Sequence, residues 1–280
     1  MACDAAAVPV VAPVRPLWIW PWRPSAAIAV RTYHAASALA RWLGPYGYWL
    51  AAALLIGAVP VVVDALIGSH TSRLVSAVLL LPLLLAAIVR DATLRGVGVM
   101  AVVFLGHSIV VIGIVAWHAE QLGEFMAAGL AYWDESREWI CTGRSPEYDV
   151  SFWLPAHFQL LGAMALFTYL SFGLATFWHG LFEVDRMNCY VGQLLLHSQN
   201  PWLAIAAGWH PWSLCRGLGY LFITFEVASL SFARLTGVQV SNSRKRLGRW
   251  LVGLAFLAAD GLIKYFSMES IREVLAENLA

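Results

Sequence analysis

Residues 178–186, WHGLFEVDR, bring ionisable side chains into a largely apolar part of the chain. His179 and Glu183 stand four residues apart, which places them on one face of a helix. Such a pair can ligate a metal ion or transfer a proton. The alternative is a charged helix end at the level of the lipid headgroups, because no second histidine stands nearby in the sequence. His179 and Glu183 are the candidate catalytic residues, and the sequence predicts no metal cluster.

His107 lies in another apolar stretch and is the candidate cofactor ligand. Haem in a membrane bundle takes axial ligands, usually histidines, from facing helices. His157 and His179 are 22 residues apart, about 33 Å along a helix. His107 and His118 are 11 apart, so the spacings do not match those needed for two stacked haems. One tetrapyrrole on His107 and a partner is the alternative to a hydrogen-bonded core histidine, and the sequence identifies no cofactor.

Further charges interrupt the apolar stretches, and a charge inside a bilayer is unfavourable unless it is paired or hydrated. Asp260 and Lys264 are four residues apart and can pair on one helix. Glu226 has no local partner, so it is either protonated or meets a cation such as Lys264 from another helix. A structural polar clamp is the favoured interpretation, and a proton- or ion-handling site is the alternative. The intramembrane polar cluster predicted here comprises Arg216, Glu226, Asp260 and Lys264.

The composition shows what kind of element must carry these residues. Of 280 residues, 60% are hydrophobic and 12% are charged, whereas soluble domains carry about 25% charged residues. Most of the surface must therefore face lipid or other helices. A spanning helix needs roughly 20 apolar residues, which predicts an all-α, polytopic bundle of about seven spans. The predicted spans are Tyr46–Ile67, Leu74–Val89, Gly96–Trp117, Leu154–His179, Asn188–Trp209, Ser213–Phe232 and Trp250–Phe266.

Charge asymmetry predicts the orientation. Arginine and lysine dominate the segment before residue 46, the turn Arg90–Arg95 and the loop Ser241–Arg249, whereas the loop His118–Val150 holds seven acids and two arginines. The positive-inside rule places the basic segments, and with them the N-terminus, in the cytoplasm. A re-entrant pair of half-helices broken at Asn200-Pro201 is the alternative for the fifth span, and it would leave six crossings.

The chain divides into three predicted parts. Residues 1–45 form an N-terminal interfacial segment, with a helix at Ala26–Trp42 lying on the headgroups. Residues 46–268 form the bundle, with an acidic outer loop at 118–150, and residues 269–280 form a short amphipathic tail. Ala255 and Ala259 are small residues four apart in the last span, where another helix could approach closely.

The C-terminal half, from Phe152 onwards, resembles stage II sporulation protein M and its relatives in layout. An apolar span is followed by a glycine-bearing helix (YVGQ, residues 190–193), a span after a proline, a basic loop and a last span. The resemblance implies a polytopic partner in a larger membrane complex, and we expect the bacterial cytoplasmic (inner) membrane. Separately, Trp178-His179-Gly180 is similar to the catalytic histidine segment of membrane-bound O-acyltransferases, which implies a catalytic role for His179.

The sequence holds no recognisable nucleophile–base pair or phosphate loop. This favours a non-catalytic scaffold or conduit subunit of a larger membrane assembly, with the lipid bilayer and other membrane subunits as partners. A net charge of +1 gives no field that would recruit nucleic acid. The alternatives are a membrane enzyme acting through His179 and a tetrapyrrole- or quinone-binding redox subunit.

Overall fold

The computed structural model describes residues 23–42, 47–67, 71–118, 127–144, 150–238 and 240–279. Ten α-helices account for nearly all of these residues, and none of the described segments forms a strand. The helices are α1 (Arg23–Trp42), α2 (Gly47–Ile67), α3 (Ser72–Val89), α4 (Thr93–His118), α5 (Ala127–Thr142), α6 (Val150–Ser171), α7 (Leu174–His197), α8 (Pro201–Gly208), α9 (Pro211–Thr236) and α10 (Ser243–Asn278).

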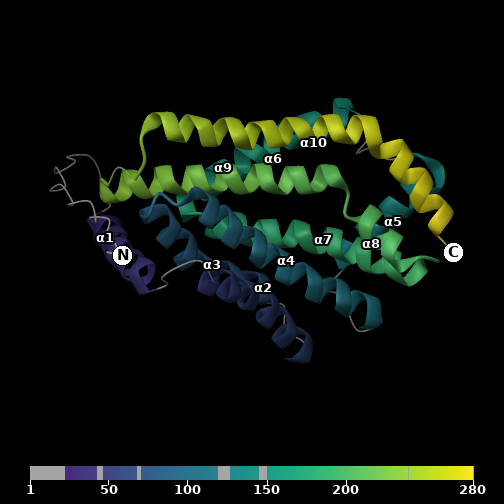
Figure 1. The fold of residues 1–280 in the computed structure, drawn as a ribbon, viewed down its shortest axis with the longest axis horizontal. Coiled ribbons are helices and arrows are strands. Elements are labelled where there is room, and N and C mark those ends of the chain that lie inside the picture. Colours follow the sequence, from purple (N-terminus) through teal and green to yellow (C-terminus); the bar gives the residue numbers. More distant parts are fainter. Residues whose placement is uncertain are drawn as a thin grey trace, which may run out of the picture.

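Long helices run along the main axis of an elongated bundle (Figure 1). α9 and α10 lie side by side, while α2, α3, α4 and α7 pack below them in the view. Within the described residues, five helices are long and apolar enough to cross a membrane: α2, α3, α4, α9 and α10. The prediction of a helical, multi-pass membrane protein is therefore confirmed at this level, although fewer helices meet this criterion than the seven predicted spans.

The predicted fourth span, Leu154–His179, is wrong as a continuous helix, because the chain reverses direction inside it. α6 ends at Ser171 and α7 begins at Leu174, with Phe172 and Gly173 between them at φ of 58° and 103°. This left-handed backbone is readily adopted by glycine. The hydroxyl groups of Thr168 and Thr176 lie 2.6 Å apart and join the two helices beside the reversal.

The predicted fifth span, Asn188–Trp209, is also divided. α7 continues through its first half to His197, and α8 occupies its second half. Between them, Asn200 accepts hydrogen bonds from the backbone N–H groups of Trp202 and Leu203, and Pro201 follows at the first helical position. This is a helix start, and the eight residues of α8 reach only about 12 Å. The break lies where the six-span alternative placed it.

The two ends of the bundle are covered by short or peripheral helices. α1 contacts α3 and α9 through buried Tyr33, Ala36 and Ala40, while Arg31 and Arg41 are exposed. The interfacial position of this helix stays a prediction, and residues 1–22 lie outside the described residues. At the opposite end, α5 and α8 gather near the C-terminus (Figure 1). The predicted tail from residue 269 continues α10 as far as Asn278.

Three hydrogen bonds at this second end join α10 to the segment between α7 and α8. The side-chain oxygen of Asn278 accepts from the backbone N–H of Asn200 at 2.9 Å, and its amide nitrogen donates to the Asn200 carbonyl at 3.2 Å. The N–H of Gln199 also donates to the Asn278 carbonyl at 2.9 Å. The end of α10 is thereby attached to the junction of α7 and α8.

Glycine residues set the closest helix contacts. A Cβ atom added at Gly57 of α2 would lie 2.1 Å from the Val103 carbonyl oxygen of α4. In the same way, Gly219 of α9 and Gly253 of α10 face each other, and a Cβ at Gly219 would lie 3.0 Å from the Gly253 carbonyl oxygen. The close approach of α10 to α9 is therefore made at Gly253, whereas the predicted small residue Ala255 is exposed.

We expect Gly57→Ala to lower the free energy of unfolding by about 1–3 kcal/mol, because the added methyl group overpacks the contact of α2 with α4. Gly98→Ala in α4 is the matched control, since a Cβ there meets nothing within 4 Å. Better helix propensity should leave that variant as stable as the parent or more stable by up to about 1 kcal/mol. Denaturant unfolding in detergent measures both, and equal stability of the two variants would contradict the close approach.

Candidate functional site

A cavity of about 470 Å³ opens among α4, α6, α7 and α9. Its apolar wall includes Phe104, Leu160 and Met164, with further leucines from α9. Its polar side chains come mainly from α7 and α9, with one serine from α4 and one tyrosine from α5. They are Ser108, Tyr132, Thr176, His179, Glu183, Arg186, Asn188, His210, Ser213, Arg216, Tyr220 and Thr224. The predicted site residues His179, Glu183 and Arg216 thus line one cavity.

The WHGLFEVDR segment lies within α7, which begins four residues before it at Leu174, so the segment does not continue the helix that forms the first part of the predicted fourth span. The charged-end alternative stays a prediction. His179 Nε2 lies 4.0 Å from a Glu183 oxygen, and Arg186 donates to Glu183 at 3.1 Å. The Arg186 guanidinium also lies 5.0 Å from the centre of the Tyr132 ring. These side chains form a partly exposed polar wall in which the glutamate charge is paired.

Arg216 and Asp260, both in the predicted polar cluster, form a two-pronged ion pair between α9 and α10. Arg216 Nε and one terminal nitrogen lie 2.9 and 3.2 Å from the two Asp260 oxygens. His157 of α6 lies 3.9 Å from the same carboxylate. The ammonium of Lys264 lies 5.8 Å from the Trp153 ring, and its predicted pairing with Asp260 stays a prediction. The carboxylate of Asp260 is therefore neutralised by a neighbouring helix.

A second network, which the sequence analysis missed, lies behind the cavity wall. Asp185 of α7 accepts from Arg73 Nε of α3 at 2.5 Å and from His107 Nε2 of α4 at 2.6 Å. Asp185 and His107 are buried, and the Arg73 guanidinium lies 5.1 Å from the Phe182 ring. The residues are 112 and 78 positions apart in sequence, so no local spacing could have indicated this contact. One carboxylate connects three helices.

Glu226 of α9 lies near the start of α10, and it is fully buried. Arg246 and Arg249 of α10 approach its two oxygens at 3.3 and 2.7 Å. Arg249 also pairs with Asp91 at 2.7 Å, in the turn between α3 and α4. The expectation that Glu226 meets a cation from another helix is confirmed, but Lys264 as that cation is wrong. Two arginines from the first turns of α10 thus neutralise Glu226 of α9.

His210 lies at the cavity end near α5 and α8, just before α9 begins. Burial and the nearby charges of Lys264 and Arg216 lower the pKa of His210 to about 3, so its ring is neutral at physiological pH. Its Nε2 lies 3.2 Å from the Tyr190 hydroxyl, and its ring stacks on Trp212 with centroids 4.4 Å apart. The cavity lining at this end thus includes an uncharged histidine that packs against aromatic side chains.

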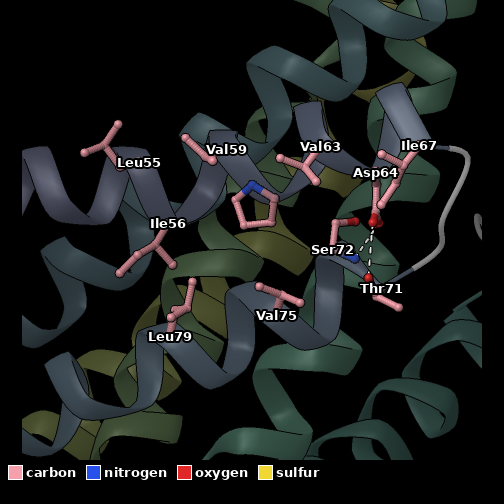
Figure 2. A pocket seen from close by; sticks show the side chains of 11 residues that line it. Leu55, Ile56, Val59, Val63, Asp64, Ile67, Thr71, Ser72, Val75 and Leu79 are labelled. Carbon is pink, nitrogen blue, oxygen red and sulfur yellow. Dashed lines mark hydrogen bonds between the residues drawn. The ribbon is translucent and has the colours of Figure 1, made fainter.

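A separate groove of about 410 Å³ lies between α2 and α3. Figure 2 shows its side chains, including Leu55, Val59 and Val75, which are about half exposed. Among the described residues that line it, Asp64 alone is acidic, and it accepts from the Ser72 backbone N–H and, at 3.2 Å, from the Thr71 hydroxyl. Carboxylates stabilise the positive end of a helix in this way. The groove is lined almost entirely by apolar side chains, and Asp64 has a structural role at the start of α3.

His107, the candidate cofactor ligand, does not face the cavity. Its ring is fully buried against Asp185 and does not line the cavity. Among the described residues, no three His, Cys, Asp or Glu side chains are grouped so that they could hold a metal ion. Comparison of the chain with protein-family models, with curated proteins and with solved structures finds no match. The resemblance to stage II sporulation protein M therefore stays a prediction.

We expect Asp185→Asn to lower the free energy of unfolding by about 3–5 kcal/mol, because it leaves the Arg73 guanidinium without its buried anion. Adding Arg73→Met should recover part of the loss, since no unpaired charge then remains. Glu269→Gln removes an exposed pair with Arg272 and should change stability little. Denaturant unfolding in detergent tests all three, and a double variant that is less stable than Asp185→Asn alone would refute the pairing.

Proposed function

We propose that this chain crosses the membrane seven times and binds an amphiphilic molecule in the cavity among α4, α6, α7 and α9. The observation that carries the proposal is one cavity with an apolar wall from α4, α6 and α9 and a polar wall from α7 and α9. Its volume is within the roughly 300–1,000 Å³ of ligand-binding pockets. A molecule with a hydrocarbon part and a polar head matches both walls.

The seven crossings comprise the five most apolar helices together with α6 and α7. These two have 22 and 24 residues, about 33 and 36 Å at 1.5 Å per residue, enough to cross. The three charges of α7 are compatible with a crossing because each is paired: Asp185 meets Arg73 of α3, and Glu183 meets Arg186 of the same helix. With α8 at one surface, this count keeps both the Arg90–Arg95 turn and the Arg244–Arg249 segment on the cytoplasmic side.

Lateral access supports a ligand that comes from the bilayer. Leu105 of α4 and Leu214 of α9 line the cavity and are 48% and 46% exposed. His179 and Glu183 are also partly exposed, at 36% and 40% of their side chains. The cavity wall is therefore reached from outside the bundle past apolar side chains, and an acyl or isoprenoid chain can extend through this opening into the surrounding lipid.

A binding role also accommodates the other functions weighed from the sequence. A scaffold or conduit subunit would use the outer face of α10, where Ala255 and Ala258 are exposed. An enzyme would use His179 and Glu183, which lie in the cavity wall, beside the bound molecule. We favour binding because it requires only the cavity and its two kinds of wall.

The topology predicts which thiols react from outside the cell. Cys141 of α5 is exposed and follows the acidic segment, so a membrane-impermeant maleimide should label it in intact bacteria expressing a variant whose other cysteines are replaced by serine. In the same background, Cys141→Ser with Arg244→Cys should be labelled only after the cells are permeabilised. Labelling of both sites in intact cells would contradict the orientation.

We expect Gly217→Leu to abolish ligand retention. Gly217 lines the cavity and a Cβ there meets nothing within 4 Å, so the leucine side chain fills open space without a clash. Gly162→Leu on α6 is the matched control, because Gly162 is equally open but lies outside the cavity lining. Native mass spectrometry of chains released from mild detergent should show a retained lipid on the parent and on Gly162→Leu only. Equal retention by Gly217→Leu would refute the cavity as the binding site.

A further inference from the structure

Two side chains in the cavity wall carry hydrogen-bonding groups that the protein leaves unused. Asn188 of α7 is fully buried, and neither its amide nitrogen nor its amide oxygen has a hydrogen-bond partner within the described part of the chain. The hydroxyl of Ser108 of α4, 1% exposed, is likewise without one. Both residues line the cavity. Buried polar groups of folded proteins almost always have partners, so these atoms indicate where a ligand group binds.

The two residues belong to the same level of the bundle. Ser108 follows His107 directly on α4, and Asn188 lies three residues after Asp185 on α7. The 2.6 Å contact of His107 with Asp185 holds these two helices together at this point. Ser108 and Asn188 are therefore fixed by a rigid contact beneath them, and together they offer a donor and acceptors to a molecule in the cavity.

The charges around the cavity are already balanced. Arg186 pairs with Glu183 at 3.1 Å, and Arg216 pairs with Asp260 at 2.9 Å. His210 is neutral, as described above. An anionic head would add a charge to a site whose two guanidinium groups are each occupied by a carboxylate, and burying an uncompensated charge is strongly unfavourable. A neutral head forms hydrogen bonds with Asn188 and Ser108 without this penalty.

We infer that the ligand is an uncharged lipid whose head carries both a hydroxyl and a carbonyl group, bound by the Asn188 amide and the Ser108 hydroxyl. The hydroxyl of the lipid donates to Asn188 Oδ1, and its carbonyl accepts from Asn188 Nδ2. Its chains lie against Phe104 and Leu160 and leave between Leu105 and Leu214. This inference deepens the proposed function and depends on it, because it names the chemistry of the molecule held in the same cavity.

Two lipids that differ only in the head test the inference. The purified full-length chain in non-ionic detergent is titrated with dioleoylglycerol and, separately, with dioleoylphosphatidic acid, and occupancy is measured by native mass spectrometry. We expect dioleoylglycerol to bind about tenfold more tightly or better, since the phosphate brings a buried charge. Asn188→Leu should weaken dioleoylglycerol binding about tenfold by removing its hydrogen bonds. Because Asn188 has no hydrogen-bond partner among the described residues, this variant is expected to fold.

Gln159→Leu is the control, because Gln159 is exposed on α6 and does not line the cavity. It should leave both affinities unchanged. Phosphatidic acid binding as tightly as dioleoylglycerol, or an Asn188→Leu variant that keeps the parent's affinity, would overturn the inference. If Gly217→Leu still abolished binding in those cases, the proposed function would stand. Binding of neither lipid to the parent chain, with no lipid retained from the membrane, would overturn both.

Discussion

A carboxylate buried among apolar helices must be neutralised, and three such carboxylates take their cation from a different helix, which joins the bundle. Asp185, Asp260 and Glu226 are each nearly or fully buried, and each is paired with arginine from a neighbouring helix. Removing such charges from water is unfavourable, and only close geometry compensates for it. The three carboxylates therefore fix which helices are neighbours, and they do so at three separate places in the bundle.

Close backbone contact between helices holds the bundle together in addition to charge pairing. Where α2 meets α4 and where α9 meets α10, glycines remove the side chain that would hold the helices apart. In lipid, helix association depends on such close packing because the hydrophobic effect does not distinguish a helix from its surroundings. The cavity lies among α4, α6, α7 and α9, and Leu160 and Met164 form part of its α6 wall. Two of the helices around it, α4 and α9, are each held closely by a neighbour on another side, α2 and α10.

Features carried by neighbouring residues could be predicted from the sequence, whereas contacts between residues far apart in the chain could not. Long apolar runs identified α2, α3, α4, α9 and α10, because hydropathy is a property of neighbouring residues. The reversal at Phe172-Gly173 was missed since two apolar helices meet there without a polar loop. His179, Glu183 and Arg216 were selected because a charge in an apolar run stands out. Asp185 with Arg73 could not be found, because their contact joins residues 112 positions apart. Asn188 was missed because an uncharged amide gives no such signal.

The contacts of α10 have a bearing on biogenesis. This helix carries Arg246 and Arg249 for Glu226, Asp260 for Arg216, and Asn278 for the junction before α8. While the ribosome is still translating α10, α9 already holds Glu226 without the two arginines that neutralise it. Synthesis of α10 is therefore the step that supplies the cations for a carboxylate already placed among apolar helices.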